Sequence, residues 1–331
     1  MFDGISRTID EFGNGILTAL NDIQGVFGKE LNVANPVKNS ILELVGNTPL
    51  IRLNQIGSHI SGVQFFIKAE FQNPTGSLRD RSSLGMLRDA EKKGKLKPGS
   101  KILITGTGSS SISISWAGRT LGYKVICVLP ESTEQSATLK LKHYGAELLL
   151  TSEESIQSFI LTRLQDSNYW FPDETRNMAN PNQHFHTTGP EVFRDLQGKI
   201  DYLIAGGGTG ASITGIGRFL KSRKETQNSK ILLSGFDSSV FYQYFVQNKA
   251  QNLPEIFDPK VVDEFISVTK EEALHYQSDL MEKEGLPIGI TTGMIVAAAI
   301  RYSEKVILGF DSDSNSIKET RNFVILSPDR E

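Results

Sequence analysis

The sequence is poor in cysteine and histidine and has almost no excess charge of either sign. Its single cysteine, Cys127, excludes an internal disulfide and lies in an apolar run, 125–129, typical of a buried strand. A net charge of -3 provides no basic surface for nucleic acid. His184 and His186 have no acidic residue at ligand spacing nearby, which argues against a metal site. We therefore expect neither nucleic acid nor a metal as a partner.

Long apolar runs are also missing. No stretch approaches the ~20 apolar residues that cross a bilayer. The first residues lack the basic and then apolar order of a signal peptide. We therefore expect no membrane association and a cytoplasmic location.

Residues 1–39 are predicted to form an amphipathic N-terminal arm. Apolar residues recur there at spacings of three and four, as on one face of a helix: Ile5, Ile9, Phe12, Ile16, Leu20, Ile23 and Phe27. Each of the glycines in this arm costs a helix about 1 kcal/mol relative to alanine, so the arm needs a surface to pack on. That surface is expected on the chain's own body or on the mate in a homodimer, and docking to another protein is the alternative.

The rest of the chain alternates strand-like and helix-like segments. With 331 residues it is long enough for two domains of roughly 150 residues each. Strand-like apolar runs occupy residues 63–69, 101–105, 125–129, 147–150, 202–205, 231–235 and 323–326. This alternation predicts α/β domains with open, mostly parallel sheets, which bind ligands at the carboxyl edge of their strands.

One predicted strand runs into a glycine-rich turn before a helix. The turn contains Gly208, Thr209, Gly210, Ala211 and Ser212. Glycines let backbone N–H groups turn toward an anion, the hydroxyls add donors, and the helix N-terminus supplies a favourable dipole. The turn predicts a phosphate site, with tight packing of the turn as the plainer alternative.

Two further turns are rich in hydroxyl groups. One contains Thr107, Gly108, Ser109 and Ser110, and the other includes Thr291. Hydroxyl and N–H groups at a helix start suit a carboxylate or phosphate oxygen. The alternative for each turn is an ordinary helix cap.

Several motifs resemble one family in order and spacing. Residues 73–81 read N-P-T-G-S-L-R-D-R and resemble the N-P-T-G-S-x-K-D-R loop of cysteine synthases. The segments 41–50, 187–191, 208–212 and 289–293 are similar to other motifs of that family. From about residue 40 onward the chain is identified as a member of the fold-type II pyridoxal-phosphate group, near cysteine synthase and 2,3-diaminopropionate synthase.

The resemblance implies an α/β fold of the tryptophan synthase β-like type. Two open parallel-sheet domains are expected, at 40–185 and 186–331, with a ligand cleft between them and a mobile part at about 75–185. The glycine-rich turn is expected to be a phosphate cup in the second domain.

The resemblance also shows departures at functional positions. Arg79 stands where the family has the lysine that forms a Schiff base with pyridoxal phosphate. A guanidinium with a pKa above ~12 stays protonated and cannot attack an aldehyde as an amine does. Ser109 replaces an asparagine that bonds the cofactor ring, Arg330 replaces a serine at the pyridine nitrogen, and Glu174 replaces a glutamine that holds the substrate carboxylate. The cofactor-binding and substrate-binding residues therefore remain only in part.

Two functions follow as expectations. The first is a pseudoenzyme or cofactor-independent protein that has lost Schiff-base chemistry. It would use Arg79 as an anion ligand to bind a small phosphorylated or carboxylated, amino-acid-like metabolite, with no covalently bound cofactor. The second is an active pyridoxal-phosphate enzyme that replaces the β-substituent of O-acetyl- or O-phosphoserine.

Overall fold

The computed structural model describes residues 37–249, 253–310 and 320–330, except the side chains of 307–310. Residues 1–36 of the predicted N-terminal arm therefore lie outside the described residues. Residues 41–331 belong to one compact unit, which contains two sheets.

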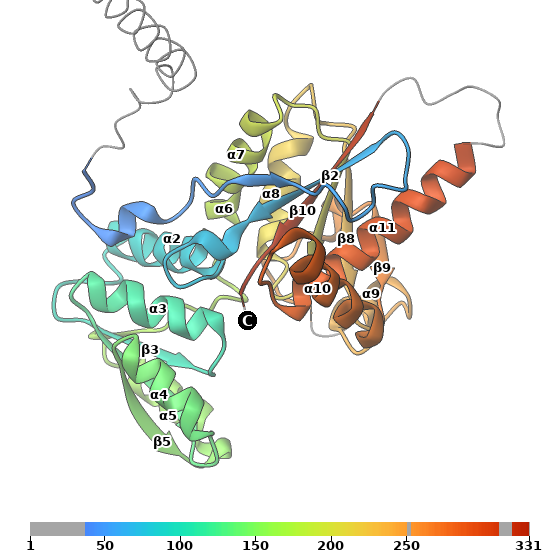
Figure 1. The fold of residues 1–331 in the computed structure, drawn as a ribbon. Helices are drawn as coiled ribbons and strands as arrows, with labels where there is room; N and C mark the ends of the chain where they lie inside the picture. The colour runs from blue at the N-terminus through green and yellow to red at the C-terminus, as the bar shows by residue number, and fades with distance from the viewer. Residues whose placement is uncertain (1–36, 250–252, 311–319, 331) are drawn as a thin grey trace, which may run out of the picture. The chain divides into compact units, whose positions relative to one another are not determined.

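The larger sheet has the order β1-β2-β10-β7-β8-β9 in the described part of the chain, with β1 antiparallel and the other strands parallel. Its strands are β1 (Leu50–Arg52), β2 (Val63–Ala69), β7 (Tyr202–Gly206), β8 (Lys230–Gly235), β9 (Glu264–Ser267) and β10 (Arg321–Ser327). Helices α10 and α11 cover one face, and α7 and α8 lie on the other (Figure 1). These four helices are α7 (Thr188–Asp195), α8 (Ala211–Lys221), α10 (Lys270–Glu284) and α11 (Ile290–Phe310).

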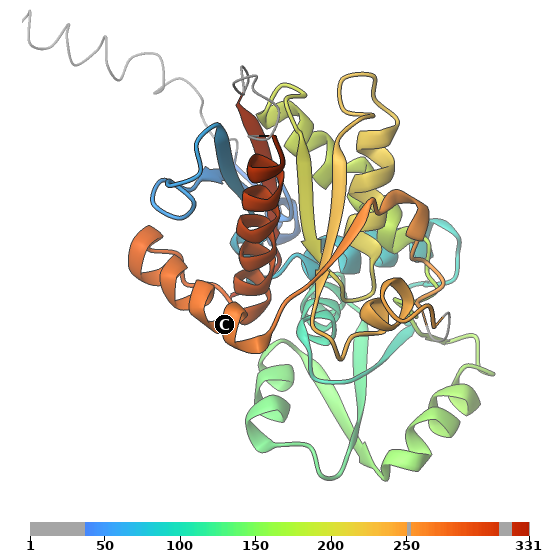
Figure 2. The ribbon, with the colours of Figure 1, turned by 90° about the vertical axis from the view of Figure 1, so that its right-hand side faces the viewer.

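The smaller sheet is entirely parallel, in the order β5-β4-β3-β6 among the described strands. Its strands are β3 (Lys101–Thr105), β4 (Lys124–Pro130), β5 (Ala146–Thr151) and β6 (Tyr169–Trp170). The remaining described α-helices are α2 (Arg79–Lys92), α3 (Ser109–Thr120), α4 (Gln135–His143), α5 (Glu153–Arg163), α6 (Ala179–His186) and α9 (Val240–Phe245). Figure 2 shows this green sheet and its helices below the larger sheet.

The predicted α/β class with parallel sheets is confirmed, and each predicted strand is observed. Sequence reasoning missed the short strands β1, β6 and β9, which have four residues or fewer and lack a sustained apolar run. β2 pairs with β10 and β1 pairs with β2, so residues 50–69 belong to the same sheet as the C-terminal strand. The proposed domain division at residue 185 stays a prediction.

Helix α2 connects the two sheets, because it packs against α3 on one side and α6 on the other. The loop before it is fixed by Asp80, whose carboxylate accepts hydrogen bonds from the backbone N–H and the hydroxyl of Thr75 at 2.7 and 2.6 Å. The first residue of α2 is Arg79, so this loop and helix together aim its side chain.

A buried charge network lies beneath this loop. Arg81 donates to Glu70 at 2.6 and 2.8 Å, and to both carboxylate oxygens of Glu191 at 2.7 Å. Lys68 lies 2.9 Å from Glu191 and donates to the carbonyl oxygen of Thr48 at 2.6 Å. Its side chain is fully buried. Lys68 is therefore a structural lysine near the end of β2.

Candidate functional site

The glycine-rich turn lies between β7 and the N-terminus of α8. Gly210 precedes the helix with a φ of 74°, in the left-handed region that favours glycine. A Cβ atom at this position would lie 2.5 Å from the ring of Phe257, and one at Gly207 would lie 2.4 Å from the ring of Phe241. Packing and backbone geometry therefore both require glycine here, and the bare backbone lines a cavity.

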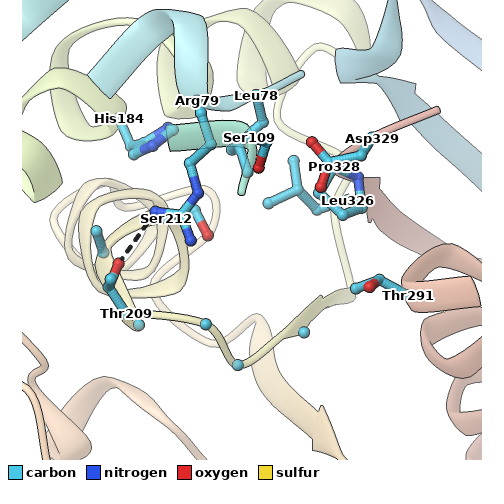
Figure 3. Close-up of a pocket in the computed structure, with 15 residues that line it drawn as sticks. Leu78, Arg79, Ser109, His184, Thr209, Ser212, Thr291, Leu326, Pro328 and Asp329 are labelled. Carbon is cyan, nitrogen blue, oxygen red and sulfur yellow. Dashed lines mark hydrogen bonds between the residues drawn. The ribbon is translucent and has the colours of Figure 1, made fainter. Parts of the chain in front are cut away.

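The Arg79 side chain extends over this turn. Its Nη1 atom lies 3.4 Å from the hydroxyl of Thr209 and 3.4 Å from a carboxylate oxygen of Glu174. Its Nη2 atom lies 2.8 Å from the place that a Cβ of Gly208 would take. Figure 3 shows the guanidinium reaching toward Thr209, with a dashed line for the hydrogen bond between them. Arg79 is thus a cation at the mouth of the glycine turn, with 19% of its side chain exposed.

Glu174 lies beside Arg79 and comes from the loop before α6. The Ser110 hydroxyl donates to its carboxylate at 2.5 Å, and the Asn180 side chain holds its backbone carbonyl at 2.9 Å. Both contacts of Arg79 Nη1 are long, at 3.4 Å, so the guanidinium retains donor capacity for another acceptor. The predicted residues Arg79, Glu174, Thr209 and Ser110 are therefore brought together.

The cavity at the turn has a volume of about 140 Å³. Of the predicted site residues, the ones that line it are Arg79, Ser109, Gly208, Thr209, Gly210, Ala211, Ser212 and Thr291. The cavity is also lined by residues that sequence reasoning did not assign to the site: Leu78, His184, Gly206, Gly207, Leu326, Pro328 and Asp329. We call the cavity the cup cavity.

A second hollow of about 520 Å³ adjoins the cup cavity and shares Ser109 and Asp329 with it. The predicted substrate residues Thr107 and Gly108 line this second hollow, as does Arg330. The residues that the sequence assigned to one site are therefore divided between two neighbouring spaces.

The two residues Asp329 and Arg330, near the C-terminus, do not line the same spaces. Arg330, expected at the pyridine nitrogen, donates from Nε to the carbonyl oxygen of Phe71 at 3.0 Å and lines the second hollow. Asp329 is the residue that reaches the cup cavity, opposite Thr209 in Figure 3. Burial raises the pKa of Asp329, while a hydrogen bond with Ser77 and the charge of Arg79 act against that rise. The cavity therefore presents a carboxyl group on this side.

His184 lines the cup cavity from α6. Its Nδ1 atom lies 2.9 Å from the hydroxyl of Thr188. Burial lowers the pKa of His184 to about 3, and the positive charges of Arg81 and Arg79 act in the same direction. His184 is therefore neutral at pH 7 and adds no charge to the cavity. The sequence motif His184-x-His186 gave no signal for this role, because helix packing decides which face meets the cavity.

Within the described residues, no cluster of three or more His, Cys, Asp or Glu side chains could hold a metal ion. In the same part of the chain, no helix is both long and apolar enough to span a bilayer.

Comparison with known proteins places this site in a family. Residues 41–311 match the family model of the pyridoxal-phosphate dependent enzymes. Cysteine synthase A of Escherichia coli (strain K12) is 34% identical over 279 residues, which cover 78% of this chain and 85% of that protein. Cysteine synthase B of Salmonella typhimurium is 30% identical over 269 residues, covering 80% and 88%.

A solved structure is also similar. The hydrogen sulfide-producing enzyme of Fusobacterium nucleatum superposes with a TM-score of 0.79 at 28% identity, over 90% of this chain and 98% of that one. Together with the parallel sheets and the glycine turn at a helix N-terminus, these similarities lead to one conclusion. The chain belongs to the pyridoxal-phosphate dependent enzymes of fold type II and is cysteine synthase-like.

Proposed function

We propose that this protein binds a small anionic, amino-acid-like ligand in the cup cavity and has lost Schiff-base chemistry. The observation that carries the proposal is the Arg79 guanidinium, which lies over the glycine turn beside Thr209. A planar guanidinium binds a carboxylate or phosphate through two parallel hydrogen bonds. The backbone N–H groups at the start of α8 complement it from below.

The family's cofactor fits this site at one end. Its phosphate suits the turn that contains Gly208, Gly210 and Ser212, because bare backbone and a hydroxyl line the cavity there. When bound, pyridoxal phosphate supplies an aldehyde for imine formation and an electron sink. The described residues that line the cup cavity include no lysine, and Lys68 is paired with Glu191. The aldehyde end therefore has no amine partner among the described residues that line the cavity.

The chain's own residues suffice for binding and orientation of an anion. Arg79 neutralises the charge, Thr209 and Ser212 offer hydroxyl donors, and neutral His184 closes one side. Glu174 pairs with Arg79, since its carboxylate lies 3.4 Å from Nη1. An incoming anion would compete with Glu174 for the guanidinium.

An active β-replacement enzyme that uses O-acetyl- or O-phosphoserine is the alternative. It is supported by cysteine synthases 30 to 34% identical to this chain and by the preserved cup. The homodimer and the cytoplasmic location stay predictions under both proposals.

Borohydride treatment separates the two functions. We expect the protein, incubated with pyridoxal phosphate and then reduced, to keep its unmodified mass at the cup, because an imine requires a free amine. Intact mass spectrometry followed by peptide mapping measures this. A stoichiometric reduced adduct on Lys140, which lines the neighbouring hollow, or on any other cleft lysine would contradict the proposed loss of Schiff-base chemistry.

Arg79→Lys alone should not produce cysteine synthase activity. Ser109 is shorter than the family's asparagine, and Asp329 rather than a serine faces the cavity, so a cofactor ring would be poorly positioned. Positioning errors of about 1 Å can cost ~100-fold in rate. Cysteine formation from O-acetylserine and sulfide is the assay, with cysteine synthase A of Escherichia coli as positive control. Turnover by the single variant would identify Arg79 as the one functional lesion.

A further inference from the structure

The second hollow presents two cations. Lys140, from α4, and Arg330, which follows β10, both line it, and both side chains are exposed to solvent. Hydroxyl groups of Thr107, Ser109 and Tyr144 lie along the same surface. Asp329 is the one acidic residue among the described residues that line it. The lining therefore carries an excess of positive charge together with hydrogen-bond donors.

Arg330 is held in place before any ligand binds. Its Nε atom donates to the carbonyl oxygen of Phe71 at 3.0 Å, and its backbone N–H donates to Gly76 at 3.2 Å. Its Cγ and Cδ atoms would lie 3.6 Å from a Cβ at Gly76, so the stem packs along this glycine. Within the described residues, its two terminal nitrogens have no protein acceptor. The two terminal nitrogens of Arg330 are thus available to a ligand in the hollow, and binding would cost little further side-chain entropy because the side chain is already held.

Lys140 is the second cation that lines the hollow. Its charge acts on the Asp329 carboxyl, although no carboxylate of the described chain lies within 4.0 Å of its ammonium group. Asp329 offsets part of the positive charge, but its burial favours the neutral form of that carboxyl. Even with Asp329 ionised, the described lining of the hollow keeps one positive charge in excess, because two cations face one carboxylate.

We propose that Lys140 and Arg330 bind a second acidic group of the ligand whose first acidic group lies in the cup cavity. Ser109 and Asp329 line both spaces, so the two are adjacent, and the proposed ligand extends past these residues from one into the other. The ligand class is then a molecule with a phosphate at one end and a carboxylate at the other. This inference rests on the proposed anion binding at the cup.

The test is calorimetry on the full chain with three probes: inorganic phosphate, butyl phosphate and 4-phosphooxybutyrate. The last two differ only by a terminal carboxylate. We expect 4-phosphooxybutyrate to bind about tenfold more tightly than butyl phosphate, because two partly exposed ion pairs with its carboxylate can contribute that much. Lys140→Gln and Arg330→Gln should each reduce this ratio, and the double variant should abolish it. Affinity for inorganic phosphate should stay within about twofold.

Lys142→Gln is the matched control, since this exposed lysine lies on the same helix and does not line the hollow. It should leave the ratio unchanged. Equal affinity for the two esters would overturn this inference and leave the cup intact. A loss in Lys142→Gln as large as in Lys140→Gln would also overturn it, since it would reveal only general attraction to positive charge. If none of the three probes binds, the proposed anion binding at the cup fails first.

Discussion

Arg79→Ala should weaken the binding of inorganic phosphate about ten- to a hundredfold. A charge-assisted hydrogen bond contributes roughly 1.5–3 kcal/mol, and the anion would lose its principal cation. The free protein should lose little stability, because both hydrogen bonds of Arg79 Nη1 are 3.4 Å long. Calorimetry measures the first effect, and urea unfolding measures the second.

Glu174→Gln is the counterpart with the opposite sign. It removes the carboxylate that competes for Arg79 and keeps the size of the side chain, so phosphate should bind several-fold more tightly. Unchanged phosphate affinity in Arg79→Ala would mean that Arg79 is a relic, and binding would then have to come from the glycine turn and the hydroxyls of Thr209 and Ser212.

Glu191→Gln should destabilise the fold by about 3–5 kcal/mol, the typical cost of removing one partner from a buried ion network. Both carboxylate oxygens of Glu191 accept from Arg81 at 2.7 Å, and Lys68 lies 2.9 Å away. The glutamine keeps the shape but leaves Arg81 with only Glu70, and Lys68 with only Asp195 at 3.5 Å, as a carboxylate partner among the described residues. Urea unfolding at neutral pH measures the loss.

The same network predicts an acid-dependent loss of stability. Hydrogen bonds and charges from Arg81 and Lys68 outweigh burial and lower the pKa of Glu191 to about 2, from an ordinary value of 4.5. A lowered pKa contributes stability that is complete above pH 4.5 and lost as the pH falls toward 2. Glu191→Gln should therefore be less sensitive to pH in this window than the wild type.

Glu147→Gln is the control for both effects. Glu147 pairs with Lys124 at 2.6 Å on the surface, where 58% and 46% of the two side chains are exposed. Such pairs contribute about 0–1 kcal/mol. A cost for Glu191→Gln no larger than that of this control would show that the network adds nothing to stability.

Local pattern in the sequence determined the strands and the cup. Strands β2, β3, β4 and β7 lie in parallel sheets, whose strands are covered on both faces and therefore read as continuous apolar runs. Such runs are recognisable without tertiary information. The glycine turn was also visible, because the proposed anion binding depends on backbone N–H groups within a few consecutive residues. Arg79 was identified through the loop that resembles the cysteine synthases.

Only the tertiary structure decided which distant side chains meet. Arg79 reaches Thr209, 130 residues later in the chain, because α2 and α8 are both packed against α6. Asp329 lines the cup cavity, while its neighbour Arg330 donates to Phe71. Successive side chains of an extended segment point to opposite sides, so neighbours in the tail face different surroundings. Sequence spacing fixes contacts within one turn or strand, whereas the direction of a side chain between two sheets depends on how those sheets pack.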